Sequence, residues 1–162
     1  MGRVKPYSEK TRKKFEPTSI AAVVQWAAQE GYTRSKQQHG LFSRTDLWIA
    51  RKTGPWNKVE VEVKTHWTNE DHPPYLPINV KAEKLNREKY DFRVFFQTNW
   101  HERTKSIDRM WIMTRKQLEV YPIKPQDNDF LKGELFIKIP WYAPEYWKLT
   151  KKGIWINYEP ES

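Results

Sequence analysis

The sequence contains no cysteine, little glycine and no long hydrophobic run. The 162 residues include 0 Cys and 6 Gly. The lack of cysteine excludes a disulfide scaffold, a thiolate zinc site and a cysteine nucleophile, and the few glycines form no Walker-type phosphate loop. No apolar run approaches the roughly 20 residues of a membrane span, and no signal-peptide segment follows Met1. We therefore expect a soluble cytoplasmic, or at least intracellular, protein with no membrane partner.

Aromatic residues and positive charge are abundant. The chain has 9 Trp, 8 Tyr and 7 Phe, which are enough to fill a hydrophobic core. Lys and Arg total 29 against 20 Asp and Glu, so the net charge is +9. A surplus of this size favours a polyanionic partner, with DNA as the expected one.

The composition changes along the chain and predicts three segments. Residues 1–17 form a basic arm, which is either a solvated tail or an arm that follows phosphates. Residues 18–121 carry the patterns of an α/β core. Residues 122–162 are rich in proline and aromatic side chains, and we expect them to form an extension packed on this core. As an alternative to packing on the core, some of their aromatic rings would stack on bases or form a dimer interface.

Three helices are expected within the core. The first begins after Ser19 and ends at Gly31, because apolar residues recur with helical spacing and form a single stripe: Ile20, Val23, Val24, Ala27 and Ala28. The second runs from Asn79 to about Tyr90. The third is short and begins with the capping-box spacing of residues 114–117.

Strands are expected at 32–37, 46–52, 58–65, 91–97 and 109–113, with a further strand-like segment at 134–139. Residues 53–57 have turn composition, so the strands on either side of them should form an antiparallel hairpin. The resulting order is αβββαββα. It predicts an α/β fold in which helices flank both faces of one mixed sheet.

This hairpin is expected to gather a catalytic constellation. If it turns near Gly54, opposed residues have numbers that sum to about 108, which sets Asp46 opposite Glu62. Lys64 follows on the same face, and the intervening valines point to the core. Two close carboxylates favour a divalent cation, Mg²⁺ or Mn²⁺, that activates water, and Lys64 orients or deprotonates this water. The alternative is that Glu62 and Lys64 are solvent-facing partners on an amphipathic strand.

The motif Thr45-Asp46 followed by Glu62-Val63-Lys64 resembles the PD-(D/E)XK nuclease superfamily, which includes restriction endonucleases and Holliday-junction resolvases. The resemblance covers residues 18–121, with Thr45 in place of the motif's proline. It implies a restriction-endonuclease-like core and a metal-dependent nuclease. Asp46, Glu62 and the carbonyl of Val63 would hold the metal, and Lys64 would be the catalytic lysine.

Three further residues are candidates for this site. Many members of the superfamily carry a glutamate on the first helix, and here Glu30 and Gln25 are the residues that can take its place. Otherwise this helix contributes nothing to the metal. Glu60 shares the face of Glu62 and either forms a salt bridge with Lys58 or Arg51 or holds a second metal.

The expected function is that of a Mg²⁺-dependent endodeoxyribonuclease. Cutting both strands of a duplex makes a homodimer natural. The alternatives are a non-catalytic nucleic-acid-binding protein on the same fold and an assembly protein that uses its aromatic tail. Basic residues expected to contact DNA phosphates, unless they only solvate a surface, are Lys10, Arg12, Lys13, Lys14, Arg34, Lys36 and Arg44.

Overall fold

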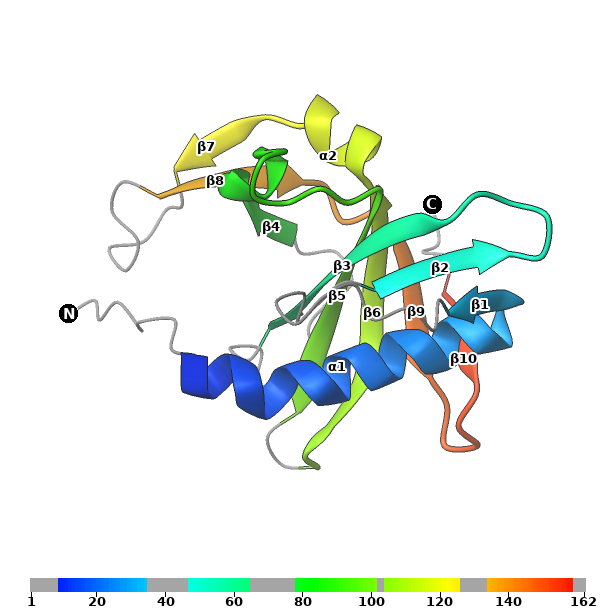
Figure 1. Ribbon diagram of the computed structural model, residues 1–162. Coiled ribbons are helices and arrows are strands. Elements are labelled where there is room, and N and C mark those ends of the chain that lie inside the picture. The colour runs from blue at the N-terminus through cyan, green and yellow to red at the C-terminus, as the bar shows by residue number, and fades with distance from the viewer. Residues whose placement is uncertain (1–8, 35–46, 65–77, 102–103, 126–133, 159–162) are drawn as a thin grey trace.

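The computed structural model describes residues 9–34, 47–64, 78–101, 104–125 and 134–158; for residues 9–16 and Lys64 it describes the main chain alone. Within these ranges the protein is an α/β fold with a curled, strand-rich mixed sheet and few helices (Figure 1). The expectation of an α/β class with a mixed sheet is confirmed. No helix in the described ranges is both long and apolar enough to span a membrane.

Ten strands, two α-helices and one 3-10 helix make up the described fold. The helices are α1 (Glu9–Gln29), the 3-10 helix η1 (Ala82–Leu85) and α2 (Arg115–Val120). The first five strands are β1 (Tyr32–Arg34), β2 (Leu47–Arg51), β3 (Asn57–Lys64), β4 (Ile78–Lys81) and β5 (Val94–His101). The others are β6 (Ser106–Thr114), β7 (Ile123–Pro125), β8 (Leu135–Ile139), β9 (Glu145–Leu149) and β10 (Trp155–Asn157).

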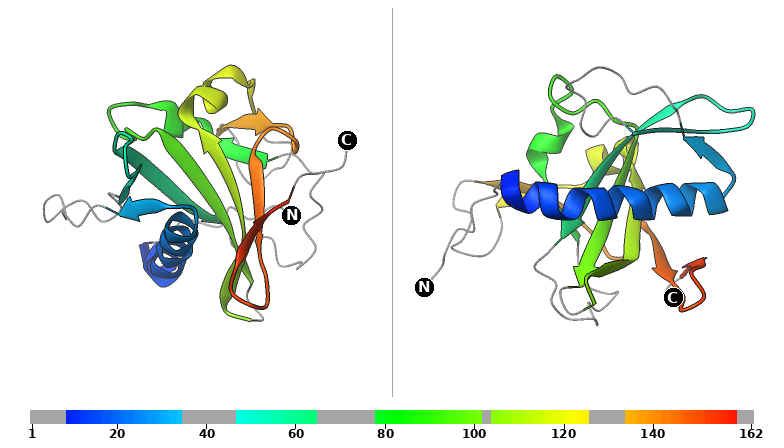
Figure 2. Two further views of the ribbon diagram at one scale, coloured as in Figure 1. Left: turned by 90° about the vertical axis from the view of Figure 1, so that its right-hand side faces the viewer. Right: turned by 60° about the horizontal axis from the view of Figure 1, so that its bottom comes forward.

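The strands form two sheets. The main sheet has seven strands in the order β1-β2-β3-β5-β6-β9-β10, and a second sheet has the order β4-β8-β7. Strands β3 and β5 are parallel, whereas the other paired strands are antiparallel. Helix α1 packs on one face of the main sheet and the second sheet packs on the other, as the two views in Figure 2 show. The main sheet therefore has two different coverings.

Helix α1 buries one apolar stripe against the main sheet. Val23 and Ala27 belong to the predicted stripe and are buried, together with Trp26. Trp26 packs against Phe96 of β5 and Trp147 of β9, with ring centroids 5.2 and 5.4 Å away. The helix ends as expected at Gly31, whose φ of 84° is one that glycine adopts without strain.

The predicted start of the first helix is wrong. Helix α1 begins at Glu9, within the expected basic arm of residues 1–17, and continues through Pro17. A proline inside a helix removes one main-chain hydrogen bond and crowds the preceding turn, which is why the sequence pattern favoured a start after it. Part of the expected arm is therefore the first half of α1.

The predicted helix over residues 79–90 is also wrong. Residues 78–81 form strand β4, which pairs with β8 more than fifty residues later, and only the single turn η1 follows. Contacts so distant in sequence leave no mark on local periodicity, so tertiary pairing overrides local helix propensity here. The order αβββαββα is corrected accordingly. The second face is covered by the sheet of β4, β8 and β7 together with α2, whose Leu118 is buried there.

The C-terminal residues are integral to both sheets. Strands β9 and β10 extend the main sheet, while β7 and β8 build the second sheet with β4. Trp147 and Trp155 of the aromatic tail are buried in the same cluster as α1. The expected strand near 134–139 is confirmed as β8, and the capping box at Thr114 is confirmed at the start of α2.

Candidate functional site

The hairpin of β2 and β3 positions the predicted acidic motif. Its antiparallel pairing is confirmed, but Leu47 pairs with Val59, so the paired numbers sum to 106 instead of 108. The loop centres on Thr53 rather than Gly54, which shifts the register by two residues. An even shift keeps every side chain on its expected face. Asp46 lies outside the described residues. Its expected pairing with Glu62 required numbers that sum to 108, and the observed register of the hairpin does not support that sum.

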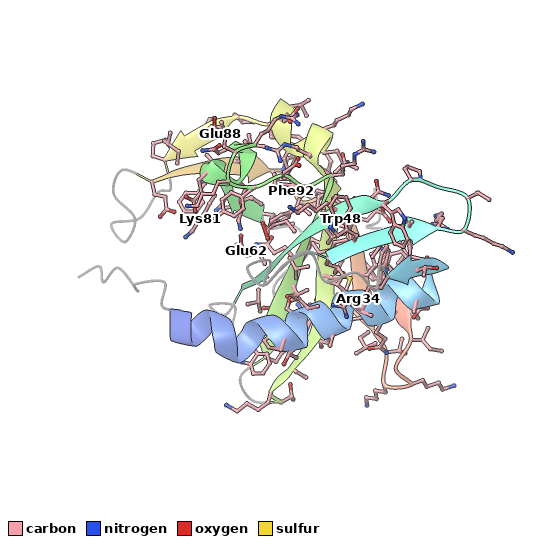
Figure 3. All side chains as sticks on the ribbon, viewed as in Figure 1. Arg34, Trp48, Glu62, Lys81, Glu88 and Phe92 are labelled. Atoms are coloured by element: carbon pink, nitrogen blue, oxygen red, sulfur yellow. The ribbon has the colours of Figure 1, made fainter. Side chains whose placement is uncertain are left out.

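The two faces of β3 have opposite chemistry. Val59, Val61 and Val63 pack into the apolar cluster on α1, as the alternation predicts. Glu60 and Glu62 therefore face the other way, toward β4 and η1. In Figure 3, Glu62 lies between β3 and this segment, near Lys81. Lys64 ends β3, and its side chain is outside the described part of the chain.

Lys84 of η1 binds both carboxylates of this face. Its Nζ lies 3.7 Å from Oε2 of Glu60 and 4.0 Å from Oε2 of Glu62. The three side chains are only 12–17% exposed, so water screens them weakly. The structure thus shows a salt bridge of Glu60 with Lys84, a residue that the sequence did not suggest as its partner. One ammonium group is therefore shared by two carboxylates.

Tyr90 completes this acidic cluster. The Lys84 ammonium lies 4.2 Å from the centroid of the Tyr90 ring, within the range of a cation–π contact. Burial raises the pKa of the Tyr90 phenol, and the carboxylates of Glu83 and Glu60 raise it further, against Lys89 and Lys81. The cluster therefore favours the neutral phenol.

A row of buried polar side chains lies beside Glu62 on the same face of the main sheet. Gln97, Asn99 and His101 occupy alternate positions of β5, and Gln97 pairs with Glu62 in the parallel register. Gln97 and Asn99 have 0% exposure and His101 has 3%. Among the described residues, both amide atoms of Gln97, both of Asn99 and Nδ1 of His101 meet no hydrogen-bond partner.

The neighbouring polar residue on the opposite face of β5 is fully bonded. Thr98 Oγ1 lies 2.7 Å from Oγ of the buried Ser19 in α1. The Thr98 hydroxyl also donates to the main-chain oxygen of Glu62, 3.3 Å away. Buried hydroxyls are normally paired in this way, so the unpaired amides next to Thr98 are the exception.

Aromatic and charged side chains of β6 and β9 lie beside this polar row. Nε2 of His101 bonds Oδ1 of Asp108 in β6. The ring of Tyr146 stacks on that of Trp111, the residue paired with Gln97, with centroids 5.0 Å apart. Burial raises the pKa of Tyr146 to about 12, although the charge of Arg109 opposes this shift.

The candidate ligands on the first helix lie away from Glu62. Gln25 donates to the main-chain oxygen of Gly153, 3.0 Å away, before β10. Glu30 follows α1 and accepts a hydrogen bond from Gln29, while its main-chain oxygen accepts one from Arg51 at the turn end of the hairpin. Helix α1 packs on the face opposite Glu62, so the structure does not bring Gln25 or Glu30 to the acidic cluster.

The predicted basic contacts are only partly described. Arg34 ends β1 and is exposed; Figure 3 shows it beside α1. Lys10, Arg12, Lys13 and Lys14 lie on the first turns of α1, where the main chain alone is described. Lys36 and Arg44 fall outside the described residues.

Sequence reasoning missed Lys84, Gln97 and Asn99. Lys84 lay in a segment expected to be helical, and no spacing links it to Glu62. The amides did leave a signal, since the polar residues 97–99 interrupt an otherwise largely apolar strand. Within the described ranges, no three or more His, Asp or Glu side chains gather as a ready metal site.

We compared the chain with known proteins in three ways. No protein-family model matches it, and neither the curated proteins nor the solved structures yield a match.

Proposed function

We propose that this protein is a metal-dependent endonuclease that hydrolyses DNA phosphodiester bonds. Asp46, Glu62 and the Val63 carbonyl would hold Mg²⁺ or Mn²⁺, and Lys64 would act beside them. The restriction-endonuclease-like arrangement of this core is part of the proposal. It is supported by the antiparallel strands β1-β2-β3 followed by β5 parallel to β3.

One observation carries the proposal. The carboxylates of Glu60 and Glu62 are held together on a partly buried face, where both lie within reach of the ammonium of Lys84. Carboxylate oxygens are ligands that Mg²⁺ prefers, so the residue types present fit such an ion.

The covalent chain supports a role for Asp46. Strand β2 begins at Leu47, which pairs with Val59. Because successive Cα atoms are about 3.8 Å apart, Asp46 begins one peptide unit from a residue paired with β3. A carboxylate at this position has the reach to join the acidic face of β3.

Each residue then has a distinct chemical role. The bound cation would lower the pKa of a water molecule and bind a phosphate oxygen. Asp46 and Glu62 fix the position of that cation. Lys64 orients the attacking water and offsets the negative charge that builds on the phosphate. The net charge of +9 attracts the DNA backbone.

The test is cleavage of supercoiled plasmid by the full chain, with Mg²⁺ or with a chelator. Asp46→Asn and Lys64→Met should each lower the rate at least about 100-fold, the scale lost when one charge-stabilising group is removed. Glu83→Gln is the matched control, because Glu83 is exposed and pairs with Lys89 outside the acidic face. Cleavage that survives in Lys64→Met, or that needs no metal, would contradict the proposal.

A non-catalytic nucleic-acid-binding protein on the same fold is the second candidate. The observation that favours it is Lys84, which already supplies a cation to Glu60 and Glu62. This candidate predicts DNA binding that weakens steeply with salt, with no strand cleavage in any metal. Plasmid cleavage and binding measured on the same preparation therefore separate the two functions.

A further inference from the structure

The polar row of β5 has no role in the metal chemistry proposed above. Gln97 and Asn99 carry four buried side-chain atoms without a partner, and His101 adds Nδ1. A buried polar group without a partner is costly, because it has lost its bonds to water and gained none in exchange. Three such side chains at alternate positions of one strand indicate a site built for a ligand.

The unpaired atoms define the chemistry of that ligand. The amide nitrogens of Gln97 and Asn99 are donors and their oxygens are acceptors. A metal ion would satisfy the oxygens alone. A phosphate would satisfy the nitrogens but meet the carboxylate of Glu62, the neighbour of Gln97 in the sheet. A planar group with alternating donors and acceptors along its edge satisfies both kinds of atom.

The surroundings favour a flat, aromatic ligand. Gln97 lies between Glu62 on β3 and Trp111 on β6, and Trp111 stacks on Tyr146 with an interplanar angle of 19°. Amide side chains bonding a base edge, next to aromatic rings, are the usual means of recognising an unstacked nucleobase.

We infer that Gln97 and Asn99 bind the edge of a nucleobase that has left its stack. This inference rests on the proposed function, because it takes nucleic acid as the source of the base. The inference adds a substrate class to that function, namely DNA with an unpaired or extruded nucleotide. The base of this nucleotide would enter the polar row, and the DNA backbone would pass Glu62. Both amides are fully buried, so binding of a base requires this face to open.

The first experiment measures nucleoside binding to the full chain without metal, by tryptophan fluorescence. Adenosine, guanosine, cytidine and thymidine are titrated separately, with ribose 5-phosphate as the control that lacks a base. We expect at least one nucleoside to bind and the sugar phosphate not to bind. If no nucleoside binds, the inference is wrong whatever the cleavage assay shows, because this assay needs neither metal nor catalysis.

Two variants tie that binding to the amides. Gln97→Met and Asn99→Leu keep approximately the volume of each side chain and remove its polar atoms. Each should weaken nucleoside binding at least tenfold while leaving the melting temperature unchanged or higher, because an unpaired polar group has been removed. Unchanged binding, or a melting temperature that falls in both variants, would show that the amides serve the fold and would overturn the inference.

Oligonucleotides distinguish a free nucleotide from a base within a strand. A single strand, the same strand with one abasic position, and a fully paired duplex are compared at fixed salt. The single strand should bind more tightly than the duplex, and Gln97→Met should remove that preference. Equal binding of all three, or binding of a peptide rich in main-chain amides in place of nucleosides, would contradict a nucleobase site.

Discussion

The two faces of strand β5 treat buried polar groups in opposite ways. On the α1 face, the hydroxyl of Thr98 is bonded to Ser19 and to the main chain of Glu62. One residue earlier, on the other face, the amide of Gln97 is equally buried and has no partner. Both faces of the sheet carry an apolar core, so the difference lies in the polar side chains of β5 itself. It marks the second face of β5 as the one that has polar atoms left for a ligand.

The largest effect should come from the α1 face. Trp26→Ala removes a ring that packs against Tyr32, Phe96 and Trp147. Deleting a buried Trp costs about 3–5 kcal/mol of unfolding free energy. Urea denaturation measures the loss. A loss as large for Gln97→Met would erase the distinction between the two faces.

The second-largest effect is a loss of stability at alkaline pH, and it concerns a residue of the polar face. The phenol of Tyr146 has a pKa of about 12 in the folded chain and 10.0 as the reference value. Below pH 10 the stabilisation is fully present; as the pH rises to 12 the unfolded chain releases this proton first, so about 2–3 kcal/mol is lost. Unfolding measured from pH 9 to 12 should show this decline. The decline should be smaller in Tyr146→Phe, and equal declines would contradict the assignment.

Lys84→Met should have a smaller effect on stability. The substitution leaves Glu60 and Glu62 close together without the shared ammonium. Because these side chains are partly buried, we expect a loss of about 1–2 kcal/mol, between the values for exposed and buried pairs. Thermal unfolding at pH 7 measures this change. Adding Mn²⁺ should restore more stability to Lys84→Met than to the parent chain, and no such difference would argue against cation binding by these acids.

The smallest effect tests the bonded pair of the α1 face. Ser19→Ala leaves the Thr98 hydroxyl without one partner, at a cost of about 1 kcal/mol. Combining it with Thr98→Val should cost less than the two single changes together, because both hydroxyls then leave. A double-mutant cycle by urea denaturation gives this coupling. Strict additivity would show that the pair contributes nothing.

Local sequence signals predicted the elements whose contacts are local. The helical periodicity of α1, the β2–β3 hairpin and the capping box at Thr114 depend on residues close along the chain, and all three are present. Of the predicted stripe, Val23 and Ala27 are buried, whereas Ala28 is exposed. Strand β4 was misread as helix because its partner β8 lies far along the sequence. The hairpin register was wrong by two residues because the exact centre of its loop depends on turn geometry, which composition does not determine.

In the candidate site, too, the features that depend on local contacts were predictable and those that depend on distant contacts were not. The alternation of β3 predicted that Glu60 and Glu62 share a face opposite the valines, and they do. No local pattern links Lys84 to these acids, because η1 reaches them only through the fold. The role of Asp46 and Lys64 stays a prediction. The predicted strand over 91–97 ends at Gln97, whereas β5 continues to His101, so the sequence did not place Asn99 in the sheet.

The core on α1 joins the two ends of the described chain. Gln29 accepts from the main-chain nitrogen of Trp155 and donates to its oxygen, each at 2.7 Å, and the Trp155 ring is buried with α1. Helix α1 is therefore synthesised well before β10, the strand that completes the covering of its apolar stripe. During translation, α1 is expected to remain accessible to chaperones until the ribosome has released residue 155.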